Sequence, residues 1–279
     1  MTDELKYKVE RSIRLLQAVA KTNTDIELCY SGGKDSDVIL ELAKMAGIPF
    51  TPIYKNTTID PPGTIGHVRE NGVQIVQPKR SFFKIIEAKG FPSRFARFCC
   101  SEIKEYKIKD TAILGIRKAE SSKRDAIYTK PVMCRLYDNK EENHVNQILP
   151  ILDWTLEDVQ GFILEHNIKL APYYYKTDGT VDLSRRLGCL GCPLQADRGK
   201  SDFINHPKLV RAWIKAGKIW WDKPRKKELA AHSWFSDTYE CFMARIFYDT
   251  VSDMCLNRES LFTTNWKHLL AGYYKIDLP

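Results

Sequence analysis

The chain has 279 residues, 43% of them hydrophobic, so it is long enough for one sizeable α/β domain with an appendage or for two small domains. Its 43 lysines and arginines outnumber 35 aspartates and glutamates, and the net charge of +8 suits a phosphate-rich partner, although many basic proteins bind no nucleic acid. No run approaches the roughly 18 apolar residues of a membrane span. The first residues carry positive and negative charges and lack the apolar core of a signal peptide. We therefore expect a cytoplasmic protein with no membrane partner.

The first part of the sequence alternates between helical and strand patterns. Apolar residues recur at helical spacing over 4–21, a short apolar run at 26–30 predicts a strand, and a helical period returns at 37–46. Further segments are predicted as strands at 50–54, 73–76 and 111–116 and as a helix fragment at 65–71. This alternation predicts a doubly wound, mainly parallel α/β sheet.

The second part loses the strand pattern. Thr155 is expected to cap a helix that runs to residue 163, and a tyrosine-rich loop follows at 172–175. Beyond Asp202 the sequence is helical, aromatic and basic. We therefore predict a leading helix at 1–22, a nucleotide-binding α/β domain at 23–195, and a helical C-terminal region at 196–279.

A glycine-rich loop separates the first predicted strand from the next helix. Its sequence is Ser31-Gly32-Gly33-Lys34-Asp35-Ser36. Two glycines let backbone N–H groups face a polyphosphate, and the helix N-terminus adds its positive dipole end. Lys34 would neutralise a phosphate oxygen, the serines would donate hydroxyls, and Asp35 would hold Mg²⁺ or orient the loop. The spacing differs from a Walker A loop. A glycine turn that binds nothing is the alternative.

This loop resembles that of the PP-loop ATP pyrophosphatase superfamily, which binds the pyrophosphate part of ATP with S-G-G-x-D-S and forms adenylated intermediates. The resemblance implies an adenine nucleotide α-hydrolase-like fold. It also implies that ATP is cleaved between its α and β phosphates, with Lys34 and Asp35 as catalytic residues and Mg²⁺ as the metal.

Two further segments are candidates for the same site. Asp60 follows the second predicted strand, at the carboxyl edge where open α/β sheets bind ligands, although a helix-capping Asp60 in a polar loop is an equal alternative. Residues 115–124 follow the fourth predicted strand and gather cations and hydroxyls. Arg117 offers a planar fork to an oxyanion, and Arg124 is a candidate acceptor contact; a solvated basic loop is the alternative.

Residues 115–124 look like the G-I-R-R-x-x-S-x-x-R segment of the phosphoadenosine phosphosulfate reductase branch of this superfamily. Residues 150–159 are similar to the P-I-x-D-W-T-x-x-D-V segment of that branch. The combined resemblance runs from about residue 25 to 195 and implies that Gly115 and Arg117 contact the nucleotide.

Four of the eight cysteines form two close pairs, Cys99-Cys100 and Cys189-x-x-Cys192. A C-x-x-C turn presents two thiolates to one metal, whereas adjacent cysteines suit a helix start or a large cluster better than a compact zinc site. The arrangement resembles the [4Fe–4S] ligand set of assimilatory adenylylsulfate reductases, with structural zinc or buried metal-free thiols as alternatives. The other cysteines lack mutual spacing and are expected to be packed or incidental: Cys29, Cys134, Cys241 and Cys255.

One element of the reductase pattern is missing. Sulfonucleotide reductases carry a nucleophilic cysteine in E-C-G-L-H, and this sequence contains no such string. The nearest match, Glu240-Cys241, lies in an amphipathic pattern, so we interpret Cys241 as a core residue. Without that thiol, attack on a sulfate sulfur has no nucleophile.

An ATP site, paired cysteines and a basic surface together resemble the ATP-pyrophosphatase component of bacterial DNA phosphorothioation systems of the Dnd or Ssp type. The resemblance implies that ATP adenylates a DNA phosphate oxygen and that sulfur then displaces AMP. DNA is the first acceptor class and tRNA the second, and a cysteine desulfurase or another sulfur donor would be the protein partner. A sulfonucleotide reductase and a non-catalytic nucleic-acid-binding subunit remain the rivals, and an oligomer is compatible with the sequence.

The C-terminal region fits a nucleic-acid partner. Its basic residues would follow a phosphate backbone and its tryptophans would stack on bases. These residues are Arg211, Lys215, Lys218, Lys223, Arg225, Lys226 and Lys227, with Trp213, Trp220, Trp221 and Trp234 between them. The alternative is a solvated cationic helix whose tryptophans fill the core.

Overall fold

The computed structural model forms two compact units. It describes residues 1–94, 96–136, 144–224, 230–247 and 265–279. Unit 1 comprises residues 1–56, 60–77 and 105–188, and unit 2 comprises residues 57–59, 78–104 and 189–279. This division differs from the predicted boundaries, because residues 78–104 fold with the C-terminal helices and the leading helix is part of unit 1.

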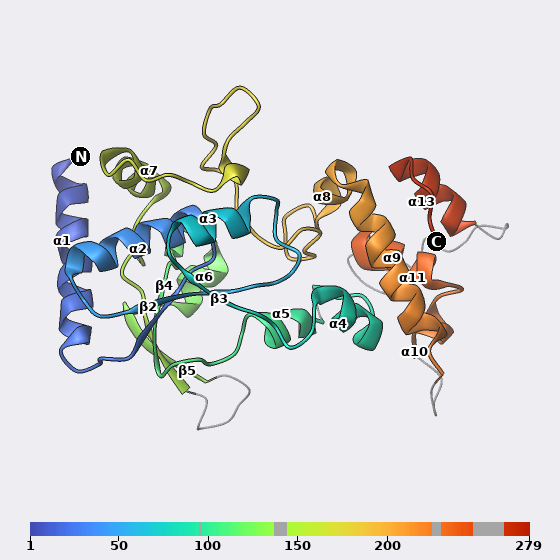
Figure 1. Cartoon of the computed structure of the whole chain (residues 1–279), viewed down its shortest axis with the longest axis horizontal. Coiled ribbons are helices and arrows are strands. Elements are labelled where there is room, and N and C mark those ends of the chain that lie inside the picture. Colours follow the sequence, from blue (N-terminus) through green and yellow to red (C-terminus); the bar gives the residue numbers. More distant parts are fainter. Residues whose placement is uncertain (95, 137–143, 225–229, 248–264) are drawn as a thin grey trace. The chain divides into compact units, whose positions relative to one another are not determined.

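Unit 1 contains one six-stranded sheet in the order β3-β2-β1-β4-β6-β5 (Figure 1). The strands are β1 (Ile26–Cys29), β2 (Thr51–Lys55), β3 (Gln74–Val76), β4 (Thr111–Leu114), β5 (Val132–Leu136) and β6 (His144–Ile148). All neighbours are parallel except β5 and β6. The predicted doubly wound, mainly parallel sheet is confirmed, whereas the β5 and β6 pair was not predicted, because exposed β5 gives a weak hydrophobic signal.

The helices of unit 1 lie near the predicted positions, except that the short helix at 122–127 was not predicted. They are α1 (Asp3–Ala20), α2 (Lys34–Ala46), α3 (Thr64–Glu70), α6 (Ser122–Ile127) and α7 (Leu156–Glu165), with the 3₁₀ turns η1 (Lys118–Glu120) and η3 (Pro172–Tyr174). As predicted, Thr155 caps α7, because its side chain accepts a hydrogen bond from the backbone N–H of Asp158. Helices α1, α2 and α7 pack against one another.

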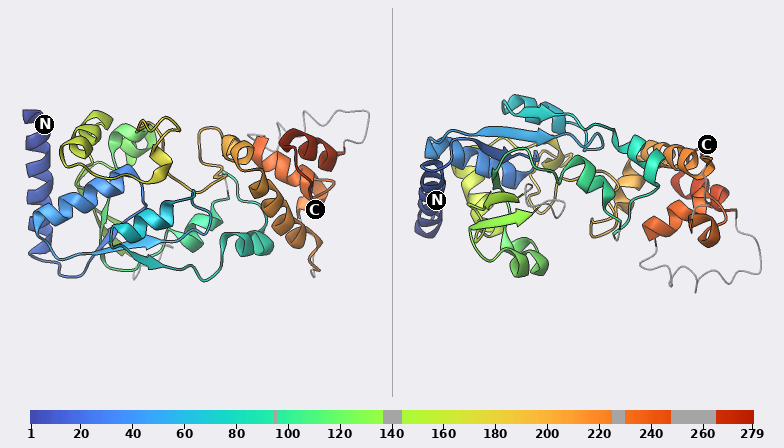
Figure 2. Two further views of the ribbon diagram at one scale, coloured as in Figure 1. Left: turned by 45° about the horizontal axis from the view of Figure 1, so that its top comes forward. Right: turned by 90° about the horizontal axis from the view of Figure 1, so that it is seen from below.

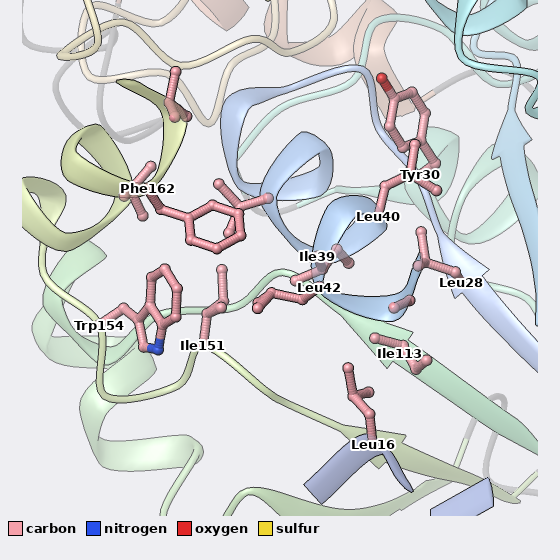
Figure 3. Packing of buried hydrophobic residues seen from close by; sticks show 14 of the residues in the cluster. Leu16, Leu28, Tyr30, Ile39, Leu40, Leu42, Ile113, Ile151, Trp154 and Phe162 are labelled. Atoms are coloured by element: carbon pink, nitrogen blue, oxygen red, sulfur yellow. The ribbon is translucent and has the colours of Figure 1, made fainter. Parts of the chain in front are cut away.

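Alternate residues of β1 face opposite sides of the sheet. Leu28 lies in an apolar core with Leu16 of α1 and Leu42 of α2 (Figure 3). On the opposite side, buried Glu27 forms an ion pair with Lys55 of β2 at 3.2 Å. The apolar face holds α1 and α2 against the sheet.

The strand order places β1 at the point where the sheet changes its direction of growth. One neighbour of β1 is β2, and the other is β4, which comes much later in the chain. In open α/β sheets, ligands bind outside the carboxyl ends of the strands at such a point. The loop that follows β1 at Cys29 therefore lies where a ligand site is expected.

Unit 2 is helical in its described residues, and Figure 2 shows its last helices from two sides. Its helices are α4 (Phe82–Lys89), α5 (Phe98–Ile103), α8 (Lys200–Asn205), α9 (Pro207–Asp222), α10 (Ala230–Trp234), α11 (Thr238–Phe247) and α13 (Trp266–Tyr274). An aromatic core joins them: Phe91, Phe203, Trp213 and Phe242 pack with ring centroids 5.3–6.3 Å apart. The predicted helical C-terminal region is confirmed.

Two of the three tryptophans of α9 lie on its buried face, and Trp221 is half-buried. Trp213 is 0% exposed and Trp220 is 8% exposed, so the prediction that these two rings stack on bases is wrong. They fill the core because each recurs on the apolar side of an amphipathic helix. Trp234 is exposed. The predicted backbone contacts Arg225, Lys226 and Lys227, together with Cys255, lie outside the described residues.

None of the helices in the described ranges is both long and apolar enough to cross a membrane.

The packing of α9 makes a testable prediction. Gly217 touches the ring of Phe91, and a Cβ atom at position 217 would lie 2.1 Å from Phe91 Cζ. We expect Gly217→Ala to lower the free energy of unfolding by about 1–3 kcal/mol in urea denaturation, because the ring and the helix must move apart. The control is Gly272→Ala in α13, where a Cβ meets nothing within 4 Å. It should be neutral or stabilising by up to about 1 kcal/mol. Equal stability of Gly217→Ala and the wild type would contradict this packing.

Candidate phosphate site and cysteine cluster

The glycine-rich loop turns sharply between β1 and α2. Gly32 has a left-handed φ of 76°, and a Cβ atom there would lie 3.1 Å from Thr64 Cγ2. Gly33 then caps α2 in an extended conformation. Both features bring the loop close to α3 and place the N-terminus of α2, with its positive dipole end, at the pocket.

An open pocket of about 230 Å³ lies at this loop. Predicted residues that line it are Ser31, Gly33, Lys34, Asp35, Ser36, Gly115 and Arg124. Residues that line it without having been predicted are Cys29, Glu120, Tyr174, Arg186 and Leu187. The structure therefore brings most of the predicted nucleotide residues and the predicted acceptor residue Arg124 to one place.

Lys34 is fixed at the base of this pocket. It is 3% exposed, and its Nζ donates to the backbone carbonyl of Arg185 at 3.1 Å. The pKa of Lys34 is lowered, mainly because the side chain is buried. The carboxylate of Asp35, whose Oδ2 lies 3.6 Å from Nζ, opposes this shift in part. A buried cation with few partners is a strong point of attraction for a phosphate oxygen.

Arg117 lies behind the pocket rather than in its lining. Its Nε donates to Asp35 Oδ1 at 2.6 Å, and its side chain is buried. Arg117 therefore holds Asp35 in place and leaves Oδ2 of that carboxylate for a metal or for Lys34. Gly115 allows this arrangement, because a Cβ atom at position 115 would lie 2.9 Å from the carbonyl oxygen of Asp35.

A second group of charges forms the opposite wall. Buried Glu120 pairs with Arg124, and its other carboxylate oxygen lies 3.3 Å from an Nη atom of Arg186. Burial, and then the charge of Arg186, lowers the pKa of Arg124. Because arginine stays charged in proteins, two guanidinium groups share one carboxylate here. Their charge remains available to an anion.

Asp60 is placed elsewhere. It accepts a hydrogen bond from the hydroxyl of Tyr54 and is absent from the residues that line the phosphate pocket. Asp60 therefore lies apart from the residues that line this pocket.

A buried polar cluster lies beneath the loop. Asp37 of α2 accepts from the hydroxyl of Tyr30 and from Nε2 of His67 at 2.9 Å, while its second oxygen has no partner among the described residues. Burial raises the pKa of Asp37. These bonds tie the first turn of α2 to β1 and α3.

The four paired cysteines meet in unit 2. Cys99 and Cys100 lie in the first turn of α5, as adjacent cysteines at a helix start, and they line one pocket with Cys189 and Cys192. A hydrogen bond with Cys100, and then burial, raises the pKa of the Cys99 thiol; burial also raises the pKa of Cys192. Lys104 lines the same pocket.

The C-x-x-C turn is held by a carboxylate. Asp202 Oδ2 accepts from the backbone N–H of Gly191 and from Nε2 of Gln195, both at 2.8 Å. Gly191 has a φ of 69°, and it packs so closely on Gly199 that a Cβ atom at position 199 would lie 2.5 Å from its Cα. This turn faces its thiols toward Cys99 and Cys100.

These thiols do not stand in the geometry of a finished metal site. Among the described residues, no group of three or more histidine, cysteine, aspartate or glutamate side chains has that arrangement. The donor chemistry nevertheless fits a soft metal, because four thiols line one pocket. Cys241 of α11 is different: it is 1% exposed, and burial raises its pKa to about 12, so its interpretation as a core residue is confirmed.

Comparison with known proteins identifies the family to which this sequence belongs. The sequence profile of the phosphoadenosine phosphosulfate reductase domain matches residues 25–195. An uncharacterized protein of Methanocaldococcus jannaschii is 27% identical over 209 residues, which cover 69% of this chain and 47% of that protein. An uncharacterized 37.8 kDa protein of Escherichia phage 186 is 33% identical over 135 residues, which cover 43% of this chain and 37% of that protein.

A further relative is named as the subunit of an enzyme. The sulfate adenylyltransferase subunit 2 of Hahella chejuensis is 26% identical over 221 residues, which cover 65% of this chain and 72% of that subunit. The chain spans about half or less of the first two relatives. The profile covers more than half of the chain and includes the phosphate loop, the Gly115 to Arg124 segment and both cysteine pairs. The chain therefore belongs to the phosphoadenosine phosphosulfate reductase domain family, within the PP-loop superfamily.

Proposed function

We propose that this protein is an ATP pyrophosphatase that adenylates an acceptor oxygen for sulfur incorporation, with a DNA backbone phosphate as the acceptor. The observation that carries the proposal is the phosphate pocket of unit 1. It combines the N-terminus of α2, buried Lys34 and the pair of Arg124 and Arg186 at the carboxyl end of β1. Such a site binds a polyphosphate and stabilises the charge that develops as pyrophosphate leaves.

The reaction exchanges one bond to the α-phosphorus of ATP for another. The acceptor oxygen bonds to the α-phosphorus, and the bond between that phosphorus and the bridging oxygen to the β-phosphate breaks, which releases pyrophosphate. The ammonium group of Lys34 and the positive end of the α2 dipole would neutralise the leaving group. Arg124 and Arg186 would hold the acceptor anion on the opposite wall. Mg²⁺, for which Asp35 Oδ2 is the candidate ligand, would supply further charge neutralisation.

Two observations favour this reaction over sulfonucleotide reduction. Cys241, the nearest match to the reductase nucleophile, is buried, and burial raises its pKa, which suppresses the thiolate that a nucleophile needs. The similarity to a sulfate adenylyltransferase subunit supports adenylyl transfer, and sulfate is therefore a third acceptor to test beside DNA and tRNA.

The first prediction from the proposed function concerns pyrophosphate release. Purified protein with Mg·ATP and DNA should release pyrophosphate, and Lys34→Ala should lower the rate on the order of a hundredfold, because a buried cation at the leaving group is lost. Lys44→Ala is the matched control, since Lys44 lies on the same helix and pairs with Glu41 at the surface. Failure to release pyrophosphate with DNA, tRNA and sulfate would refute the proposal.

For the nucleic-acid partner we propose α9 of unit 2. Lys208, Arg211 and Lys215 are exposed along one side of α9, opposite the buried tryptophans, and none of them forms an ion pair with another described residue. Cations in such a row suit a phosphate backbone, whose binding depends on charge and salt.

The second prediction tests this face. The double variant Arg211→Ala/Lys215→Ala should weaken DNA binding for all sequences alike and reduce the slope of log affinity against log salt by about 1–2, because two phosphate contacts are lost. The control is Lys6→Ala/Lys169→Ala, which removes the same charge from exposed lysines of unit 1. An equal loss in both double variants would show that net charge, and not α9, determines binding.

We also propose that Cys99, Cys100, Cys189 and Cys192 hold a [4Fe–4S] cluster, with structural zinc as the lesser alternative. When bound, a cluster of this kind supplies a redox-active or structural iron centre. The chain would contribute four thiolates and the charge of Lys104, and Asp202 would keep the C-x-x-C turn in shape.

The third prediction concerns iron. Anaerobically purified protein should absorb broadly near about 400 nm and contain iron and sulfide, and Cys189→Ser should lose both. Asp202→Ala should lose iron faster than Asp202→Asn, because asparagine keeps an acceptor for the N–H of Gly191. Cys134→Ser is the control, since Cys134 is exposed and lies on β5 of unit 1. A colourless protein with one zinc per chain would overturn the cluster.

A further inference from the structure

Tyr174 enters the phosphate pocket from a segment that carried no functional motif. It is the last residue of η3, its side chain is 1% exposed, and it lines the pocket together with Lys34 and Ser31. The hydroxyl oxygen would lie 3.3 Å from a Cβ atom on Gly33. A phenol thus sits directly against the loop that is proposed to bind phosphate.

A backbone N–H group holds this phenol in place. The Tyr174 oxygen accepts from the N–H of Lys34 at 3.0 Å. A tyrosine hydroxyl can accept and also donate its one proton. The bond to Lys34 uses the oxygen as an acceptor, and the hydroxyl proton remains to be donated.

The surroundings fix the direction of the ring. Pro172 packs against Gly63, where a Cβ atom would lie 2.8 Å from the proline Cγ. The guanidinium of Arg185 donates to the carbonyl of Tyr173 at 2.9 Å, and Lys34 Nζ donates to the carbonyl of Arg185. The segment from Pro172 to Leu187 thus contacts Gly63 at its start and the side chain of Lys34 near its end.

Among the described residues, no oxygen or nitrogen accepts a hydrogen bond from the Tyr174 hydroxyl. Burial raises the pKa of Tyr174, so the proton stays on the oxygen at neutral pH. A buried donor without an acceptor costs free energy, which a ligand that enters the pocket recovers.

We propose that Tyr174 is a phosphate ligand of this site: its hydroxyl donates to an oxygen of the bound polyphosphate while its own oxygen keeps the N–H group of Lys34 in position. The inference rests on the proposed function, because it assigns a further binding residue to the same pocket.

The test measures binding of inorganic pyrophosphate by calorimetry, without nucleotide. Tyr174→Phe should weaken binding about ten- to a hundredfold, the loss expected for one hydrogen bond to a charged group. Tyr173→Phe is the matched control, because the neighbouring ring does not line the pocket; it should bind pyrophosphate as the wild type does. Equal affinity of Tyr174→Phe and the wild type would overturn the proposal.

A second measurement covers the case in which Tyr174→Phe does not fold. Protein carrying 3-fluorotyrosine only at position 174 should show a shifted ¹⁹F resonance when pyrophosphate is added, but not with sodium chloride of equal ionic strength. An unshifted resonance overturns the inference. Tyrosine-dependent pyrophosphate binding without any pyrophosphate release from ATP would retain the inference and reject the proposed function, whereas a wild type that binds no pyrophosphate would reject both.

Discussion

The buried ion pair between Arg117 and Asp35 is the contact on which the site depends. It joins the start of α2 to the segment after β4, the two elements that meet where the sheet changes its direction of growth. Gly115 makes room for it, since any side chain there would strike the backbone of Asp35. Because the carboxylate is held on one oxygen, the loop keeps its shape before any ligand arrives, and binding needs little reorganisation.

Around this ion pair, the pocket is positive without being uniformly basic. Lys34, Arg124 and Arg186 line it, but each lies near a carboxylate or carbonyl oxygen. Such pairing lowers the cost of burying several cations together. The pocket nevertheless keeps positive charge that can bind an incoming phosphate chain.

In unit 2, the elements that carry the cysteines are held by apolar packing and close glycine contacts. Its core is aromatic, and tight glycine contacts let α4 and α9 approach closely, as at Gly217 and Phe91. In the C-x-x-C turn, one carboxylate, that of Asp202, accepts from the backbone N–H of Gly191. Four thiols line one pocket of unit 2.

Strands β1 to β4, the phosphate loop and the cysteine pairs could be predicted from the sequence, because each depends on a local signal: hydrophobic period, glycine content or close spacing. Tyr174 and Arg186 could not, since they lie outside every motif that the sequence shows, and Glu120 stands at a variable position of the 115–124 segment. The sequence also left open whether Trp213 is buried or exposed on α9 and whether Asp60 lines the pocket. Those outcomes depend on which surfaces meet in the folded chain, and no local pattern records such contacts.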